Sequence, residues 1–300
     1  MTAAPKRARA AFLRACALDV LVRKPGNVSV HSAGHGMDAA LFLASAEAAA
    51  GPLFETGARV GERVEAAVRA TWAVAGCNTN LGILLLCAPL ARAGERQPDA
   101  ATAAELRAAV VHVLADLDRA DAAAAYRAIA HANPGGLGNA ADQDVHDEPA
   151  VDLRSAMALA ADRDSIAAQY RDGYALVFDT ALPALGTAFD AAAAGGLPDD
   201  PPDAGTVASA QRAFLALLSC VPDSHIARKR GLPLATAVMH QARAWHARSP
   251  ARAALDADPA FQSWDAALKA DGVNPGTTAD LLVAAMTVAG CVGPGVPRAR

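Results

Sequence analysis

Apolar residues recur at helical spacing along most of this chain, and no run alternates in the manner of a β-strand. Residues 60–76, VGERVEAAVRATWAVAG, follow this pattern and end on a glycine, which favours a helix C-terminus there. Thr102 and Glu105 have the spacing of a capping box that starts another helix. A further helix is predicted to start at Asp164 and to stop near Pro183.

These patterns predict an all-α fold, in which residues 1–300 form a single multi-helix globular domain with long polar loops lining one pocket. The clearest break is GGLPDDPPDAG, residues 195–205, because its prolines and aspartates oppose regular structure. Two smaller domains are also compatible with the length, but we interpret this segment as a surface loop within one domain.

The composition indicates how such helices would pack. Hydrophobic residues make up 53% of the chain but aromatic residues only 4%, so much of the apolar content is alanine. Alanine is the best helix former but buries little area per residue. We therefore expect many closely approaching helices, with leucine and valine as the larger core side chains.

Charge and cysteine content narrow the function classes. A net charge of −4 and a pI near 6.0 argue against general binding to nucleic acid or to an anionic membrane surface. The five cysteines are scattered and form no CxxC, which favours reduced thiols in a cytoplasmic protein over zinc or disulfides. Arg14 and Asp19 interrupt the apolar N-terminal stretch, so we expect an amphipathic helix there rather than a signal peptide. The apolar runs 81–91 and 281–293 are shorter than the roughly 20 residues that span a bilayer.

Four polar, glycine-containing segments stand apart from the helices. They are KPGNVSVHSAGHGMD (24–38), CNTNLG (77–82), PDSHIARKRG (222–231) and NPGTTAD (274–280). Each lies beside a predicted helix terminus, where unpaired N–H groups and the helix dipole favour anions. Lys24 and the glycines of the first segment strengthen the prediction of a phosphate site. A fifth segment, residues 131–149, is long and acidic.

In the last two segments the polar residues have two possible explanations, helix capping and ligand binding. Thr277 and Asp280 have capping-box spacing for a helix over 278–292, whereas the functional interpretation adds a phosphate on the backbone of 276–278 and a metal ion on Asp280. Asp223 could cap a short helix, but it lies close to His225 and to the arginines of 228–230, and arginine grips phosphate well.

The other two segments show the same ambiguity. Asn78 or Thr79 could cap the apolar helix that follows, but capping does not explain Asn80 and Gly82. His31 and His35 are four residues apart in the first segment, a metal-binding spacing on a helix, yet the intervening glycine disfavours a helix.

In this order the segments resemble those of the triphosphoribosyl-dephospho-coenzyme A synthase family, which builds the prosthetic-group precursor of citrate and malonate decarboxylating enzymes. The family pattern has P-K-P-G with a histidine-and-aspartate loop, N-T-H-x-G, D-T-N…R-x-G and S-P-G-G-S-A-D-L-L. The corresponding residues here are 24–26 with 34–38, 78–82, 223–225 with 228–231, and 274–282.

The resemblance implies an all-helical transferase that moves a triphosphoribosyl group from ATP to a hydroxyl acceptor and releases adenine. It implies Mg²⁺ at Asp223 and Asp280, and chemistry near Asp223, His35, Asp38 and His225. The nucleotide would be held by Lys24, Gly26, Asn27, Asn78, Thr79, Asn80, Arg228, Arg230, Gly276, Thr277 and Thr278.

Several positions depart from the family pattern, with Arg23 in place of proline, Asn80 in place of histidine and His225 in place of asparagine. The acceptor is therefore left open between dephospho-coenzyme A and another cofactor precursor. The alternatives are a helical metal-dependent hydrolase of nucleotide or phosphorylated substrates and a non-enzymatic helical binding protein. We leave the assembly open, with a homodimer as one option.

Overall fold

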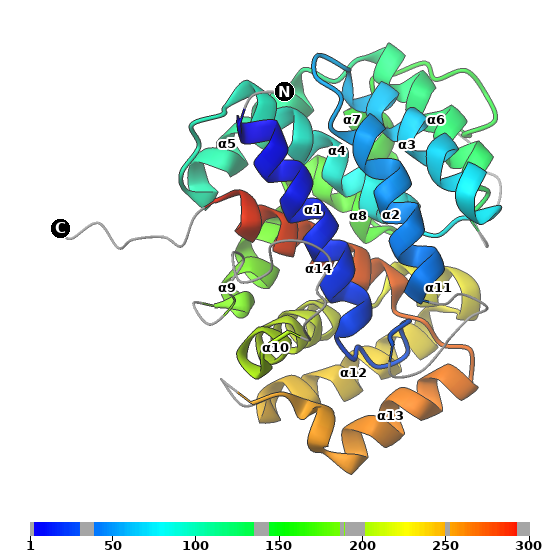
Figure 1. Cartoon of the computed structure of the whole chain (residues 1–300). Helices are drawn as coiled ribbons and strands as arrows, with labels where there is room; N and C mark the ends of the chain where they lie inside the picture. Colours follow the sequence, from blue (N-terminus) through cyan, green and yellow to red (C-terminus); the bar gives the residue numbers. More distant parts are fainter. Residues whose placement is uncertain are drawn as a thin grey trace.

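The computed structural model describes residues 3–30, 39–134, 144–186, 189, 202–249 and 253–292. In that part of the chain the regular structure is helical throughout, with no β-strand, as predicted (Figure 1). The elements are α1 Ala3–Leu21, α2 Ala39–Leu53, α3 Val60–Ala75, α4 Leu81–Arg96, α5 Ala103–Ala115, α6 Arg119–Ala132, α7 Leu153–Ala160, α8 Ser165–Asp172, the π-helix η1 Leu176–Ala181, α9 Leu182–Leu185, α10 Ala204–Cys220, α11 Ser224–Arg230, α12 Leu232–Arg248, the 3-10 turn η2 Leu255–Ala257, α13 Pro259–Ala270 and α14 Gly276–Cys291.

Helices α4 and α14 form the centre of the molecule, because both are buried around most of their circumference and they contact each other. Helices that are apolar all round belong inside a protein core. The α1 helix packs against α14 so closely that a Cβ atom added at Gly290 would lie 2.6 Å from Ala11 Cβ. Buried apolar residues from α1 to α14 form one contiguous cluster, which confirms a single helical domain built on small side chains.

Several helix ends are where the sequence predicts them. Gly76 ends α3 with a left-handed φ of 65°, and its N–H is donated to Trp72 O. Thr102 and Glu105 form the predicted capping box of α5. The described end of segment 195–205 starts α10, where Asp203 accepts N–H groups of the first turn; residues 195–201 lie outside the described residues.

The continuous helix predicted from Asp164 towards Pro183 is wrong in its middle. Asp164 does cap α8, but α8 ends at the left-handed Gly173, and Tyr174 also has a positive φ of 61°. The chain resumes as the π-helix η1 and then α9, which contains Pro183. The break lets the buried Tyr174 hydroxyl donate to Leu86 O at 2.7 Å, a tertiary contact that periodicity does not reveal.

A second tyrosine compensates for a proline inside α4. Pro89 has no N–H to donate to Leu85 O, the acceptor one turn earlier in the helix. The Tyr170 hydroxyl, from α8, donates to that same carbonyl at 2.7 Å in a buried position. The central helix therefore continues through its proline because a neighbouring helix provides the missing hydrogen bond.

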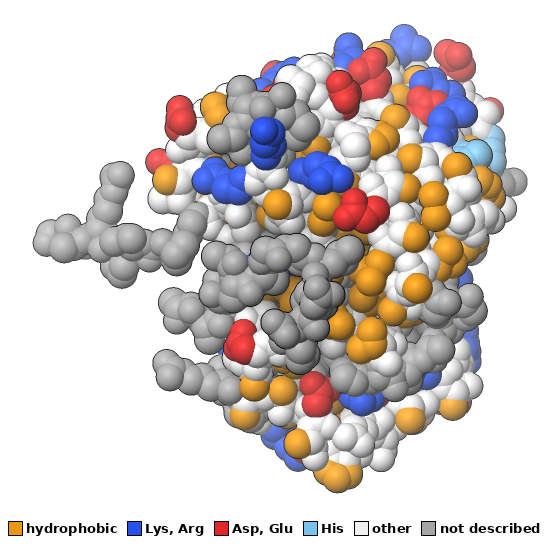
Figure 2. Space-filling view, in the orientation of Figure 1, with side chains coloured by type: hydrophobic (Ala, Val, Ile, Leu, Met, Phe, Trp, Pro, Cys, Tyr) orange, Lys and Arg blue, Asp and Glu red, His pale blue; other side chains and the backbone are white. Residues whose placement is uncertain are grey.

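The surface carries mixed charges, and acidic and basic side chains lie side by side near the top of the face in Figure 2. No single described helix is both long and apolar enough to cross a membrane. The α10 and α11 helices pass such a test only as a pair bent by 54°. Most side chains of α10 are buried against the core, which accounts for its apolar sequence.

Candidate functional site

The NPGTTAD segment starts α14 differently from the prediction. The helix begins at Gly276, no side chain caps it from Pro275, and Thr277 is buried inside the first turn. The predicted Thr277–Asp280 capping box is therefore wrong. The cap comes instead from another helix, because one carboxylate oxygen of Asp223 accepts the Thr278 N–H at 2.8 Å and its hydroxyl at 2.7 Å.

Asp223 holds two helix N-termini at once. Its other oxygen accepts the Ile226 N–H at 3.0 Å, so it caps α11 as well as α14, and it also receives the His225 backbone N–H. The side chain is 1% exposed, and this burial raises its pKa while the donors oppose the shift. Since these donors occupy the carboxylate lone pairs, the geometry does not fit the predicted metal-ligand role of Asp223.

Asp280, one turn into α14, lies over the start of α4. A Cβ atom added at Gly82 would be 2.6 Å from Asp280 Cγ and 2.7 Å from Ile166 Cδ1 of α8. Glycine at position 82 is therefore required by a close approach of three helices. The carboxylate of Asp280 also lies where the positive end of the α4 dipole favours a negative charge.

The rest of the CNTNLG segment surrounds this helix start. Asn78 Oδ1 accepts the Leu81 N–H at 3.1 Å, so Asn78 performs the local capping. Asn80 is only 3% exposed, and its Nδ2 makes no hydrogen bond with a described residue; the same holds for Thr79 Oγ1. A small hollow of about 10 Å³ lies beside these side chains and Trp72.

PDSHIARKRG contributes side chains on both sides of Asp223. His225 lies against α14, with its Nδ1 3.3 Å from where a Gly276 Cβ would stand. Arg228 pairs with Asp164 at 3.2 Å. Arg230 points elsewhere and donates to the backbone carbonyl of Asp271. The predicted pair of phosphate-binding arginines is thus separated.

The start of KPGNVSVHSAGHGMD joins the same region. Asn27 Nδ2 donates to Asn274 Oδ1 at 2.8 Å, directly before α14. Lys24 is fully buried, and its Nζ donates to the carbonyls of Asp19 and Val28 and forms an ion pair with Asp19 Oδ1 at 3.2 Å. Burial lowers the Lys24 pKa and Asp19 opposes that shift. The phosphate role of Lys24 stays a prediction, and in this structure its ammonium closes the turn.

Asp280 lies in a field of other carboxylates. Burial first, and then the charges of Asp19, Asp223 and Asp164, raise its pKa well above 3.8, while Arg228 opposes the shift. Sequence reasoning missed Asp19 as a member of this group. Its signal was an acidic residue interrupting the apolar first helix, which we interpreted only as amphipathic patterning.

The described residues fit a magnesium ion at Asp280 better than at Asp223. No group of three or more histidine, cysteine or acidic side chains among them could hold a metal ion alone. Magnesium in nucleotide sites usually needs only one or two carboxylates, with water and phosphate as further ligands. Asp280 makes no hydrogen bond or ion pair with another described residue, and its charge is disfavoured by neighbouring carboxylates.

Two predicted catalytic residues, His35 and Asp38, lie outside the described residues and stay predictions. A larger hollow of about 270 Å³ in the described part of the chain is lined by none of the predicted site residues. It lies between α3, α4, α5 and α6, where Arg59 and Arg96 are paired with aspartates. The four polar segments meet elsewhere, around the first turn of α14.

Comparison with known proteins shows the family and a structure of the same fold. The family model for CitG, ATP:dephospho-CoA triphosphoribosyl transferase, matches residues 5–294. The chain belongs to this family. A solved structure, described as a putative triphosphoribosyl-dephospho-coA synthase from Archaeoglobus fulgidus, shares the fold with a TM-score of 0.61 and 22% identity, over 83% of this chain and 96% of that one. No curated protein matches the chain.

Family membership covers all four polar segments, from the turn at Lys24 to the first turns of α14. It identifies the protein as a transferase enzyme, in agreement with the resemblance. The structure adds that the segments meet because residues 274–280 contact each of the others, through Asn274, Thr278 and Asp280. These contacts define the candidate site.

Proposed function

We propose that this protein transfers the triphosphoribosyl group of ATP to a hydroxyl of dephospho-CoA and releases adenine. The bond between the ribose carbon and adenine breaks, and a bond from that carbon to the acceptor oxygen forms. The hydroxyl loses a proton and the departing adenine gains one. The observation that carries the proposal is the meeting of four polar segments at the first turn of α14, in a chain that belongs to this transferase family.

The triphosphate would lie near the N-termini of α4 and α14. Both helices have 16 residues, and the first turn of α4 lies against Asp280, one turn into α14, at Gly82. Helix N-termini favour phosphate through their dipole and unpaired N–H groups. Asn80, with a buried amide nitrogen that lacks a hydrogen bond among the described residues, adds a donor at the same helix start.

A divalent cation would neutralise the negative charge of the carboxylates around Asp280. A triphosphate beside Asp280, Asp19 and Asp164 would be repelled, and Arg228 is already paired with Asp164. Mg²⁺ bound by Asp280 and the phosphates would neutralise that charge. Asp223 would not touch the ion but would hold Thr278, and with it Asp280, in place.

His225 would transfer the proton, because its imidazole lies beside Gly276 at this helix start. Histidine titrates close to neutral pH and can take a proton from a hydroxyl or give one to a leaving base. His35 and Asp38 remain further candidates for this role. Cytoplasmic location and a homodimer also remain predictions.

The direct test is to incubate the protein with ATP, Mg²⁺ and dephospho-CoA and to measure free adenine by chromatography. Adenine that appears only with the acceptor supports the proposal. ATP binding without adenine release would move the acceptor to another cofactor precursor, and release without an acceptor would select the hydrolase. A protein that binds no nucleotide under these conditions would refute the proposal.

Matched variants locate the chemistry. Asp280→Asn should abolish Mg²⁺-dependent adenine release, because it removes the carboxylate without changing its shape. Asp152→Asn is the control, because Asp152 also stands at a helix start, that of α7, but outside the four polar segments. Equal adenine release by both variants would exclude Asp280 from the site.

A further inference from the structure

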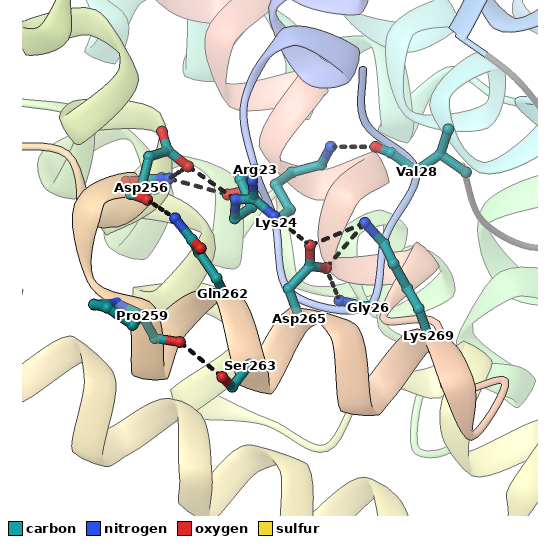
Figure 3. A network of polar contacts seen from close by, with 11 residues as sticks. Arg23, Lys24, Gly26, Val28, Asp256, Pro259, Gln262, Ser263, Asp265 and Lys269 are labelled. Atoms are coloured by element: carbon teal, nitrogen blue, oxygen red, sulfur yellow. Dashed lines mark hydrogen bonds and ion pairs between the residues drawn. The ribbon is translucent and has the colours of Figure 1, made fainter. Parts of the chain in front are cut away.

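A buried carboxylate on α13 contacts the turn that begins the first polar segment (Figure 3). Asp265 is 1% exposed, and its Oδ1 accepts the Gly26 N–H at 2.9 Å. Its Oδ2 accepts from Arg23 Nη1 at 2.9 Å and from Lys269 Nζ at 3.1 Å. One acidic side chain thus joins two cations and a backbone N–H of the turn.

The packing of α13 does not by itself require these charges. Phe261 and Leu268 already anchor the helix in the core as buried apolar side chains. Removing charges from water is costly, and buried ion pairs replaced by apolar residues of similar volume often leave stability unchanged or higher. What the charges can provide is a single position for the groups that they bind.

The turn of residues 24–27 has an unusual backbone conformation and is tightly packed. Gly26 has a left-handed φ of 83°, and a Cβ atom there would lie 2.6 Å from Val273 O and 2.9 Å from Pro275 Cδ. The turn is thus pressed against the segment that leads into α14. Asn27 completes the link through its hydrogen bond to Asn274.

Arg23 extends the network to a second element. Its Nε donates to Asp256 Oδ1 at 3.1 Å, in the η2 turn, and its carbonyl accepts from Gln211 Nε2 at 3.2 Å. The backbone on both sides of Lys24 is therefore attached to other parts of the fold. A shift of Lys24 or Asn27 would require several buried polar contacts to break together.

We propose that Asp265, with Arg23 and Lys269, is a positioning residue for nucleotide binding: it holds the turn of residues 24–27 against the start of α14. This inference rests on the proposed function, because it assumes that ATP binds at that helix start. Asp265 does not touch the substrate. It acts through Gly26, whose N–H it fixes, and through the neighbouring Asn27.

The decisive variant replaces Asp265 and its two cationic partners by apolar side chains of similar length, Arg23→Met, Asp265→Leu and Lys269→Met together. This triple variant, the triad variant, should fold and have an unfolding temperature equal to or above that of the wild type. With Gly26 N–H no longer held, we expect the dissociation constant for ATP, measured by calorimetry, to rise about tenfold, the equivalent of about 1.4 kcal/mol. A folded triad variant with wild-type ATP affinity would overturn the proposal.

A pair of single variants covers the case in which the triad does not fold. Asp265→Asn keeps an oxygen that can accept the Gly26 N–H, whereas Asp265→Ala does not. Below the unfolding temperature of both, the asparagine variant should bind ATP more tightly than the alanine variant. Equal affinities would overturn the proposal, because a merely structural charge is lost in both variants.

The control is Ser263→Ala on the same helix, because the Ser263 hydroxyl donates to Pro259 O within α13 and takes no part in the ionic group, so this variant should bind ATP as the wild type does. The two proposals fail separately. If the wild type binds ATP but releases no adenine, the proposed reaction fails while the affinity comparison still tests Asp265. If the wild type releases adenine and the triad variant binds ATP normally, only the positioning role fails.

Discussion

Tyr170→Phe tests whether a tertiary hydrogen bond sustains the central helix. The substitution removes one hydroxyl from a buried ring and leaves its apolar packing intact. In the wild type this hydroxyl donates to Leu85 O at 2.7 Å, and Pro89 cannot donate to that carbonyl from within the helix. The variant should therefore leave a buried carbonyl with no donor.

The expected cost follows from that unsatisfied group. Burying a carbonyl without its partner costs about 1–3 kcal/mol of unfolding free energy. For a large domain each kcal/mol corresponds to a fall of roughly 2–4 °C in unfolding temperature. Circular dichroism during thermal and urea unfolding would measure both quantities.

A double-mutant cycle with Pro89→Ala isolates the cause. Alanine provides the N–H that proline lacks, so the cost of Tyr170→Phe should shrink by at least about half when both changes are combined. Tyr174→Phe is the control, because its acceptor Leu86 O lies one turn before Leu90, which has its own N–H. Equal costs of Tyr170→Phe in the proline and alanine backgrounds would refute the reasoning.

Three further predictions concern the site. Because the pKa of Asp280 is raised in the folded protein, its contribution to stability is full below its usual pKa of 3.8 and is lost as pH rises through the higher folded value. Asp280→Asn should therefore raise the unfolding temperature at neutral pH and make that temperature depend less on pH. Thermal scans from pH 4 to 8 that match those of the wild type would contradict this prediction. Gly82→Ala should displace Asp280 and lower the rate of adenine release. Gly94→Ala in the same helix is the control, because a Cβ atom there meets open space, and it should stabilise the protein by about 0.5–1 kcal/mol. Similar effects of the two substitutions on activity would count against the close approach. Asp223→Asn places an amide opposite the two donors of Thr278 and should destabilise by about 1–3 kcal/mol in urea titrations, more than Thr278→Val, which removes only the hydroxyl.

The helices and many of their ends were predictable because the interactions that define them are local. Gly76 ends α3 and Thr102 caps α5 through groups within a few residues, so spacing alone locates them. The four polar segments were recognisable for a similar reason, since glycines and polar residues interrupt an apolar pattern. The sequence therefore determined the fold class, the main helices and the candidate segments.

Tertiary structure decided which partner each polar group has. Asp223 caps α14 from another helix, Asp19 joins the field around Asp280, and Tyr170 completes the hydrogen bonding of α4 across more than 80 residues. Spacing predicted a capping box at Thr277, but the nearest acceptor in space belongs to a segment 55 residues away. An aspartate can cap a helix, form an ion pair or bind a metal ion, and the sequence does not distinguish these roles. The role depends on which donors or cations the folded chain places beside the carboxylate.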